Sequence, residues 1–448
     1  MQLAILGGGE SGTGAALLAK QQGYDVFVSD SSRIATAYKQ LLIAHGIPYE
    51  ENGHTLAKII EADEIVKSPG IPNKAAIIQQ LQPYTLPILD EIEFAARYAK
   101  GSIIAVTGSN GKSTTTQLIH HFFTKAGCRA ALVGNIGHSF AKCLTEASYD
   151  YYVLELSSFQ LENIQYFKPA IACVLNITAD HLDRYDYAMA AYAKAKLNIL
   201  RNMTATDHFI YPKEDPSIQA YLTTRTILPQ CYPIASIPCP PLSNSPDVWH
   251  FNIQNQVVSI KRNLLSLLGP HNQYNATIAI TAALLAGIRP ETIIKALPTF
   301  HGLPHRLEWC GAPQGIDCYN DSKSTNVAST AAALRSFKRP IIWIAGGKDK
   351  GNDYTALLPL VQEKVKAIIC LGKDNRSLIE TFGCLALPIR ETTQIIEALR
   401  FALGLALPGE AVLLSPACAS FDLFKNFEDR GNQFKTSVNI IEALNLNR

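Results

Sequence analysis

The sequence lacks the features that mark membrane, secreted and zinc-binding proteins. No apolar run approaches the roughly eighteen residues that a membrane span needs, and the start MQLAILGGG lacks the basic segment of a signal peptide. The ten cysteines include no C-x-x-C pair and no Cys/His cluster at zinc spacing. We therefore expect reduced thiols and a cytoplasmic protein without a membrane partner.

Charge is also scarce. Charged residues make up 17% of the chain and the formal net charge is +2, so no strong field attracts nucleic acid, and we expect none as a partner. Hydrophobic residues make up 47% of the 448 residues, which indicates a well-buried globular chain. A chain of this length is expected to form two to four domains. Its function must therefore be argued from local sites.

Strand-like apolar runs alternate with helix-like stretches along the whole chain. This alternation predicts an α/β fold of three consecutive domains with mostly parallel sheets. We place a Rossmann-like domain at 1–96, a central P-loop ATPase-like domain at 97–302 and a second Rossmann-like domain at 303–448.

The first domain opens with a complete G-x-G-x-x-G pattern in ILGGGESGTG. Gly7, Gly9 and Gly12 follow an apolar strand and begin a predicted helix, and Asp30 stands at the end of the next strand. This is the dinucleotide-binding fingerprint, which places a diphosphate at a helix N-terminus. An oxidoreductase that uses NAD or FAD is one hypothesis that follows from it.

The strongest local pattern is TGSNGKSTTT at 107–116. An apolar strand leads into a turn where backbone N–H groups and Lys112 can hold nucleotide phosphates, and the hydroxyl of Ser113 can face Mg²⁺. The pattern is not a strict Walker A motif, because Val106 stands where that motif needs glycine. A P-loop switch or binding protein is a further hypothesis.

Polar residues follow the next two predicted strands of this domain. Glu155 ends a buried strand, where a carboxylate needs a partner such as Mg²⁺, although a helix cap would also satisfy it. His181 lies between acidic residues, as a loop histidine or a ligand could. Lys194 and Lys196 lie on a predicted helix, and on their own such lysines are usually solvated. The residues alone leave these alternatives open.

In the third domain, polar loops follow three predicted strands. They are NDSKSTN at 320–326, GGKDKGND at 346–353 and the segment that begins SPACASFD at 415. Because parallel strands end at one edge of a sheet, we expect these loops to form one polar cleft for a small charged substrate.

Taken together, these stretches closely resemble the Mur ligases of peptidoglycan synthesis. The resemblance runs from residue 3 to about residue 434 and keeps the family's order. The motifs that carry it are SPG, TGSNGKST, GNIG, ELSSFQL, DHLDRY, AYAKAK, GPHNQYN, GLPHR, NDSKSTN and SPACASFD-FKNFEDRG.

The resemblance implies an ATP-dependent ligase of peptidoglycan precursors. Its last motif favours the branch that adds D-glutamate to UDP-N-acetylmuramoyl-L-alanine through an acyl phosphate, releasing ADP and phosphate. Sister ligases and folylpolyglutamate synthetase are the alternatives, and the N-terminal βαβ pattern with SPG argues against the latter. The glycine fingerprint would then hold the uridine diphosphate of the substrate, and we expect a monomer.

Residue roles are carried over by matching motif. The resemblance implies that Lys112, His181 and Lys196 are catalytic, and that two Mg²⁺ ions are held by Ser113, Glu155, His181 and a carbamate on Lys196. The implied ATP contacts are Gly108, Asn110, Gly111, Lys112, Ser113, Thr114, Asn272, Asn275, Arg306, Asp321 and Lys323. The implied contacts of the UDP substrate are Gly9, Ser11, Gly12, Asp30, Arg33, Ser68, Gly70, Asn135, Ser157 and Gln160. Those of D-glutamate are Thr325, Lys350, Ser420, Phe421 and Phe427.

Overall fold

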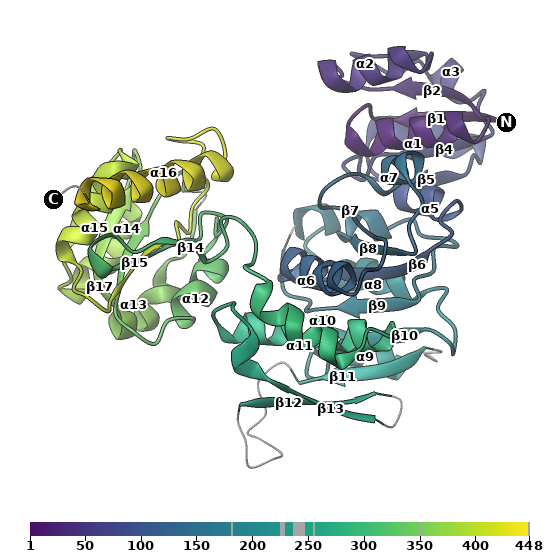
Figure 1. Ribbon diagram of the computed structural model, residues 1–448. Helices are drawn as coiled ribbons and strands as arrows, with labels where there is room; N and C mark the ends of the chain where they lie inside the picture. The colour runs from purple at the N-terminus through teal and green to yellow at the C-terminus, as the bar shows by residue number, and fades with distance from the viewer. Residues whose placement is uncertain (181, 225–228, 236–246, 254–255, 350, 447–448) are drawn as a thin grey trace. The chain divides into compact units, whose positions relative to one another are not determined.

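The protein is described by a computed structural model over residues 1–180, 182–224, 229–235, 247–253, 256–349 and 351–446 (Figure 1). The chain forms two compact units. One comprises Met1–Leu264 with Tyr274–Pro298, and the other comprises Leu265–Gln273 with Thr299–Arg448.

The N-terminal sheet has five parallel strands in the order β3-β2-β1-β4-β5. Because β1 pairs with β2 on one side and β4 on the other, the winding of the sheet reverses between β1 and β4, where open α/β sheets bind ligands. The strands are β1 (Gln2–Leu6), β2 (Asp25–Ser29), β3 (Tyr49–Glu50), β4 (Glu64–Lys67) and β5 (Ile88–Asp90). The helices are α1 (Glu10–Gln21), α2 (Thr36–Ala44), α3 (Leu56–Ile59), α4 (Ala76–Leu81) and α5 (Glu91–Ala96).

The central sheet has six parallel strands in the order β11-β10-β9-β6-β8-β7. Its middle strand, β6, is nearly all apolar because both of its faces are covered. The strands are β6 (Ser102–Thr107), β7 (Ala130–Gly134), β8 (Tyr151–Glu155), β9 (Ile171–Val174), β10 (His208–Pro212) and β11 (Gln230–Ile234). The helices are α6 (Lys112–Lys125), α7 (Phe140–Glu146), α8 (Met189–Leu197), α9 (Pro216–Thr224), α10 (Pro270–Leu285) and α11 (Pro290–Ala296), and β12 (Val248–Ile253) and β13 (Gln256–Lys261) form an antiparallel hairpin.

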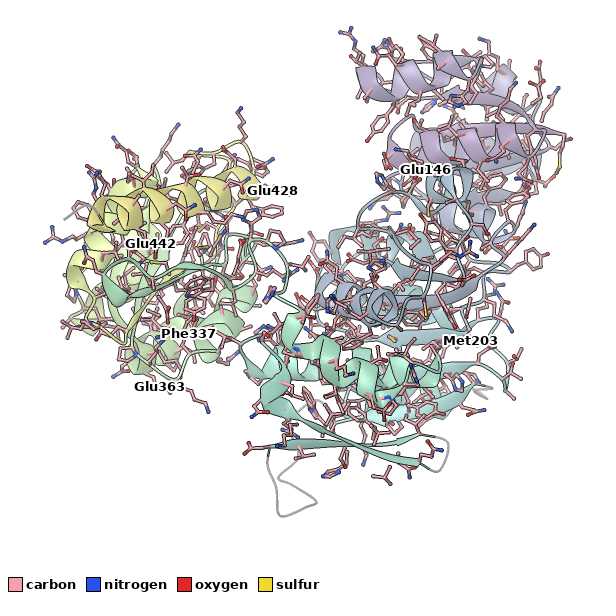
Figure 2. All side chains as sticks on the ribbon, viewed as in Figure 1. Glu146, Met203, Phe337, Glu363, Glu428 and Glu442 are labelled. Carbon is pink, nitrogen blue, oxygen red and sulfur yellow. The ribbon has the colours of Figure 1, made fainter. Side chains whose placement is uncertain are left out.

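The N-terminal and central sheets share one hydrophobic core. A single cluster of buried side chains includes Leu3 on β1, Phe140 on α7 and Phe209 on β10. Met203, labelled in Figure 2, is 2% exposed within it. Helix α1 passes close to the start of α7 at Gly14. A Cβ at this position would overlap Ser139 Oγ, so the close approach requires glycine. These two sheets therefore form one body.

Buried acids complete this joint. Asp90 Oδ2 accepts hydrogen bonds from the backbone N–H and side chain of Asn163, each at 3.1 Å. Glu93 accepts three backbone N–H groups, those of residues 165–167, at 2.8–3.0 Å. Glu91 Oε1 accepts the N–H of Ala141 at 2.7 Å, and burial raises the pKa of Glu91 to about 7. Carboxylates of β5 and α5 thus cap backbone of the central domain.

The C-terminal sheet has six strands in the order β14-β15-β19-β16-β17-β18, of which only the edge strand β14 is antiparallel. Its two faces are covered by separate hydrophobic clusters, one of which contains Phe337, labelled in Figure 2. The strands are β14 (Glu308–Gly311), β15 (Asp317–Asn320), β16 (Ile341–Ala345), β17 (Val365–Leu371), β18 (Ile389–Thr392) and β19 (Ala411–Leu414). The helices are α12 (Val327–Arg335), α13 (Leu358–Lys364), α14 (Arg376–Phe382), α15 (Ile395–Leu405) and α16 (Phe427–Leu446).

The predicted fold class is confirmed, with three α/β sheets that are mostly parallel. The exceptions are the β12–β13 hairpin and the edge strand β14. The domain boundaries at 96 and 302 stay predictions. Over the described residues, no helix combines the length and apolar character needed to cross a bilayer.

Candidate active site

The centre of the first unit is the loop between β6 and α6. Gly108 and Gly111 have positive φ angles of 151° and 86°, which favour glycine. A Cβ on Gly111 would lie 2.5 Å from Asn275 Oδ1, so this asparagine of α10 packs directly on the loop. Ser113 and Thr114, in the first turn of α6, are buried. The loop is therefore a tight turn that leads into a helix N-terminus, as phosphate binding requires.

Two lysines meet on this loop. Lys112 Nζ donates to the carbonyl oxygens of Gly108 and Ser109 at 2.8 and 2.9 Å. Lys196, from α8, donates to the same Gly108 oxygen at 2.9 Å and is only 2% exposed. Burial, together with the charge of Lys112, lowers the pKa of Lys196 to about 7. An amine that is partly neutral near pH 7 can react as a nucleophile.

Glu155 ends β8, the strand beside β6, opposite Val106. Its side chain is buried; Oε1 accepts from Asn135 Nδ2 at 2.9 Å, whereas Oε2 has no hydrogen-bond partner. A buried carboxylate oxygen without a partner is costly, and a divalent cation is the partner that its chemistry suits. His181 lies outside the described residues, within which no group of three or more His, Cys, Asp or Glu side chains could hold a metal.

A second cradle lies at the β1–β4 crevice of the same unit. A Cβ on Gly12 would overlap the carbonyl oxygen of Gly7, so helix α1 starts in close contact with the turn. Ser68 Oγ, at the end of β4, is buried against this turn and has no hydrogen-bond partner. Asp30 is already engaged, since its two oxygens accept the N–H groups of Gly8 and Ser32 at 2.6 and 2.8 Å. The structure thus places Asp30 as a support of the glycine turn.

The glycines of this cradle predict a contrast between two substitutions. Gly12→Ala should lower the free energy of unfolding by about 1–3 kcal/mol, because its Cβ meets backbone that cannot move freely. Gly9→Ala should leave stability nearly unchanged, since no atom lies within 4 Å of its added Cβ and its φ is −83°. Urea unfolding of both variants checks this, and equal losses would contradict it.

The other predicted contacts of the UDP substrate also belong to the first unit. Arg33 and Gly70 are exposed, and Ser11 is in the first turn of α1. Ser157 donates its N–H and hydroxyl to Gln160 Oε1 at 2.9 and 3.1 Å, which holds both side chains in one local ring. Among the predicted ATP contacts, Asn110 donates its N–H to the side-chain oxygen of Asn176 at 2.8 Å, which orders the loop rather than presenting that N–H outward.

In the second unit, Asp321 follows β15 and is buried. Its oxygens accept the Leu307 N–H at 3.2 Å and the Ser415 hydroxyl at 2.8 Å, and burial raises its pKa to about 6. Asn272 and Arg306 line one cavity of about 450 Å³ in this unit. Asn275 belongs to the first unit, so the predicted nucleotide contacts are divided between the two.

Of the predicted D-glutamate residues, Thr325 follows β15, Ser420 and Phe421 follow β19, and Phe427 begins α16. Thr325 and Phe421 are exposed, whereas Ser420 is buried. Lys323 Nζ lies 5.5 Å from the centre of the Phe427 ring. Lys350 lies outside the described residues. Ser415 after β19 bonds Asp321 after β15, and Lys348 after β16 pairs with Ala419, so these loops lie together at one end of the sheet, and the D-glutamate site itself stays a prediction.

Arg430 is a residue that the sequence patterns did not single out, although it stands in the FKNFEDRG motif. It is fully buried on α16 and donates to Ser322 Oγ and O at 2.9 Å and to Cys418 O at 3.2 Å. Its guanidinium thereby ties the loop after β15 to the loop after β19. Desolvation lowers the pKa of Arg430 to about 10, well above neutral pH, so the group stays charged.

Comparison with known proteins identifies the family. The chain matches the MurD N-terminal domain over 2–77, the Mur ligase middle domain over 106–283 and the Mur ligase glutamate ligase domain over 305–418. A UDP-N-acetylmuramoylalanine--D-glutamate ligase from Bacteroides fragilis is 48% identical over 98% of this chain and 99% of the relative. A relative of the same name from Porphyromonas gingivalis is 46% identical over 97% and 98%.

A solved structure shows the same fold. The MurF ligase of Thermotoga maritima in complex with ADP aligns over 94% of this chain and 95% of its own, with a TM-score of 0.59 at 12% identity. The loop between β6 and α6 (the phosphate loop) and the buried carboxylate of Glu155 lie within the matched middle domain. The glycine turn at Gly7–Gly12 lies within the matched N-terminal domain. The chain belongs to the Mur ligase family and is therefore an ATP-dependent ligase that forms a peptide bond.

Proposed function

We propose that the chain joins D-glutamate to UDP-N-acetylmuramoyl-L-alanine at the expense of ATP. The observation that carries the proposal is the meeting of Lys112 and Lys196 on the loop between β6 and α6, with the unpartnered carboxylate oxygen of Glu155 at the end of the neighbouring strand β8. The full-length similarity to D-glutamate ligases supports the choice of amino acid.

The residues present fit one of the two Mg²⁺ ions that the family implies. Glu155 offers a buried carboxylate oxygen without a partner at the end of β8. Ser113 stands in the first turn of α6, the helix that follows β6, and β6 pairs with β8. We assign these two residues to one ion, and His181 with a carbamate on Lys196 to the other. When bound, Mg²⁺ would neutralise negative charge on the phosphates.

The chain's own residues then bind and orient the reactants. The N–H groups at the start of α6 and the Lys112 ammonium would hold the ATP phosphates. The substrate carboxylate attacks the γ-phosphorus, so that a new O–P bond forms and ADP leaves. The amine of D-glutamate adds to the acyl phosphate, phosphate departs, and the amine's proton passes to solvent. The carboxylate is a poor acyl donor until phosphate provides a leaving group.

A carbamate on Lys196 agrees with its surroundings. Below its pKa the Lys196 ammonium would repel both Lys112 and a cation, and only the neutral amine can add CO₂. The product is a carboxylate on a long arm beside the phosphate loop. We assign the glycine turn with Ser68 to the substrate's diphosphate, and the Asp30–Arg33 loop to its uracil. The loops after β15 and β19 are assigned to D-glutamate.

The fingerprint's other interpretation, an NAD or FAD oxidoreductase, is disfavoured by the match of residues 2–77 to the MurD N-terminal domain. The same match disfavours folylpolyglutamate synthetase. We also propose that the protein is a monomer. We propose a cytoplasmic location, because ATP, its expected co-substrate, is available there.

One assay tests the proposed function. With Mg²⁺, bicarbonate, ATP and UDP-N-acetylmuramoyl-L-alanine, the purified protein should release phosphate on addition of D-glutamate, and should do so far more slowly with L-glutamate or other amino acids. Release with a different amino acid would identify a sister ligase. No release with any amino acid, together with micromolar binding of NAD, would overturn the proposal in favour of the oxidoreductase.

A further inference from the structure

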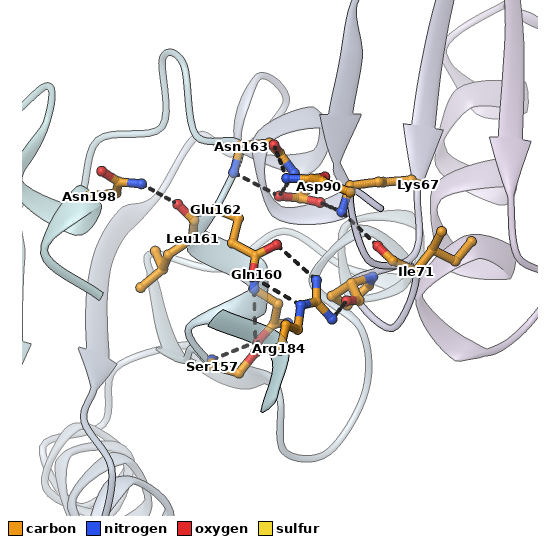
Figure 3. A network of polar contacts seen from close by, with 12 residues as sticks. Lys67, Ile71, Asp90, Ser157, Gln160, Leu161, Glu162, Asn163, Arg184 and Asn198 are labelled. Carbon is orange, nitrogen blue, oxygen red and sulfur yellow. Dashed lines mark hydrogen bonds and ion pairs between the residues drawn. The ribbon is translucent and has the colours of Figure 1, made fainter. Parts of the chain in front are cut away.

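We propose that Arg184 is a positioning residue that holds the loop 68–70 of the N-terminal domain at a fixed distance from the segment 157–162 of the central domain. The inference rests on the proposed function and extends it to a residue outside the predicted site. Figure 3 shows Arg184 between these two segments.

Arg184 makes a complete set of contacts with its guanidinium. Nε and Nη2 donate to the two oxygens of Glu162 at 3.1 and 2.8 Å, and Nη1 donates to the Pro69 carbonyl at 2.9 Å. The guanidinium carbon lies 4.0 Å above the centre of the Phe159 ring. One planar guanidinium therefore pairs with a carboxylate through Nε and Nη2, donates to a carbonyl through Nη1 and stacks on an aromatic ring with its face. No other side chain can make these three contacts at once.

The contacted residues belong to two segments that carry predicted contacts of the UDP substrate. Pro69 lies between Ser68 and Gly70, in the loop that follows β4. Phe159 and Glu162 flank Gln160, in the short helix that follows Ser157. Within the described part of the chain, the hydrogen bonds of Arg184 go to Glu162 and Pro69 rather than to residues predicted to contact substrate, so its effect passes through the loops that it holds.

The loop after β4 is fixed at its base as well. Lys67, fully buried, pairs with Asp90 at 2.9 Å and donates to the Ile71 carbonyl at 3.2 Å, which closes the loop between them (Figure 3). Asp90 in turn holds Asn163, the neighbour of Glu162. Lys67 thus anchors the base of the loop, whereas Arg184 anchors its tip. Ser68, which we assign to the diphosphate, lies between these two anchors.

The test measures the three Michaelis constants separately in Arg184→Lys and Arg184→Met. We expect the KM for UDP-N-acetylmuramoyl-L-alanine to rise about tenfold or more in both, while the KM values for ATP and D-glutamate change less than about twofold. Lysine should fail to rescue, because a point charge cannot hold Glu162 and Pro69 together. Calorimetric titration with the UDP substrate alone should show the same loss of affinity.

Arg97→Lys is the matched control. Arg97 forms the same forked pair with Glu64, at 2.7 and 2.8 Å in the same unit, but has no contact with the loop after β4. Its variant should lose stability without a change in the KM for the UDP substrate. If the Arg184 variants fold poorly, Glu162→Gln retains Arg184 and its Pro69 bond, and should raise the same KM about threefold.

Three results would overturn the inference. An unchanged KM for the UDP substrate in folded variants is one, and an equal rise in all three KM values, which marks general loss of structure, is another. Full rescue by lysine would show that charge alone acts. An inactive wild-type enzyme is a different outcome, because it overturns the proposed function and this inference with it.

Discussion

Lys196→Ala is expected to reduce kcat by about 1,000-fold or more, the scale of losing a group that stabilises charge in the transition state. The structure buries Lys196 against the Gly108 carbonyl, beside Lys112, where alanine leaves neither an amine nor a carbamate. A short carboxylate such as acetate or propionate should restore part of the activity by occupying the space of the proposed carbamate. Steady-state phosphate release with and without the carboxylate measures this.

Lys194→Ala is the control, since Lys194 is exposed two residues earlier on α8 and should be dispensable. Loss of activity in that variant would show that the helix, rather than the Lys196 side chain, is sensitive. Absence of any chemical rescue in Lys196→Ala would count against the carbamate while leaving the ligase intact.

The same residue predicts a pH dependence. Burial and Lys112 lower the pKa of Lys196 to about 7, so its amine is mostly protonated below that pH and neutral above it. Only the neutral form adds CO₂. Enzyme depleted of CO₂ should therefore regain activity with bicarbonate faster at pH 8 than at pH 6, and equal rates at the two pH values would contradict the assignment.

Glu155→Gln should reduce kcat by about 100-fold or more and raise the Mg²⁺ concentration needed for half-maximal rate. Glutamine keeps an oxygen that can accept from Asn135, but replaces the unpartnered oxygen by an NH₂ group, which cannot bind a cation. Titration of the rate with Mg²⁺ at saturating substrates separates a lost cation site from a lost fold.

Glu64→Gln gives the matched comparison, because it makes the same change in a buried carboxylate that is paired with Arg97, away from the phosphate loop. It should lower the melting temperature without altering the Mg²⁺ requirement. If the two variants shift the Mg²⁺ dependence equally, Glu155 does not hold the ion.

The sequence predicted those site residues whose position is fixed by a short pattern. Lys112 and Glu155 each follow an apolar strand, and parallel strands end together, so both were placed correctly at one sheet edge. Lys196 differs. On its own it suggested a solvated lysine, and only the family resemblance gave it a role. Its burial depends on α8 packing against the phosphate loop, which no local pattern reveals.

Contacts between segments that are far apart in the chain also could not be predicted from the sequence. Arg184 meets Pro69 across 115 positions, and Glu93 meets residue 166 across 73. Asp30 fitted a ribose or uracil contact, and no pattern showed that its Oδ2 also accepts the N–H of Gly8 in the glycine turn and its Oδ1 that of Ser32. Such pairings follow from how two sheets stack, which one sequence does not encode locally.

The acids that join the two sheets have a consequence for how the family can diverge. Glu93 binds three main-chain N–H groups, so the bonds do not depend on which side chains residues 165–167 carry, and Tyr166 is indeed 75% exposed. Any residue except proline keeps them. Residue 166 can therefore vary without loss of these bonds, whereas Phe167 is also held in the core and residue 93 must supply the carboxylate.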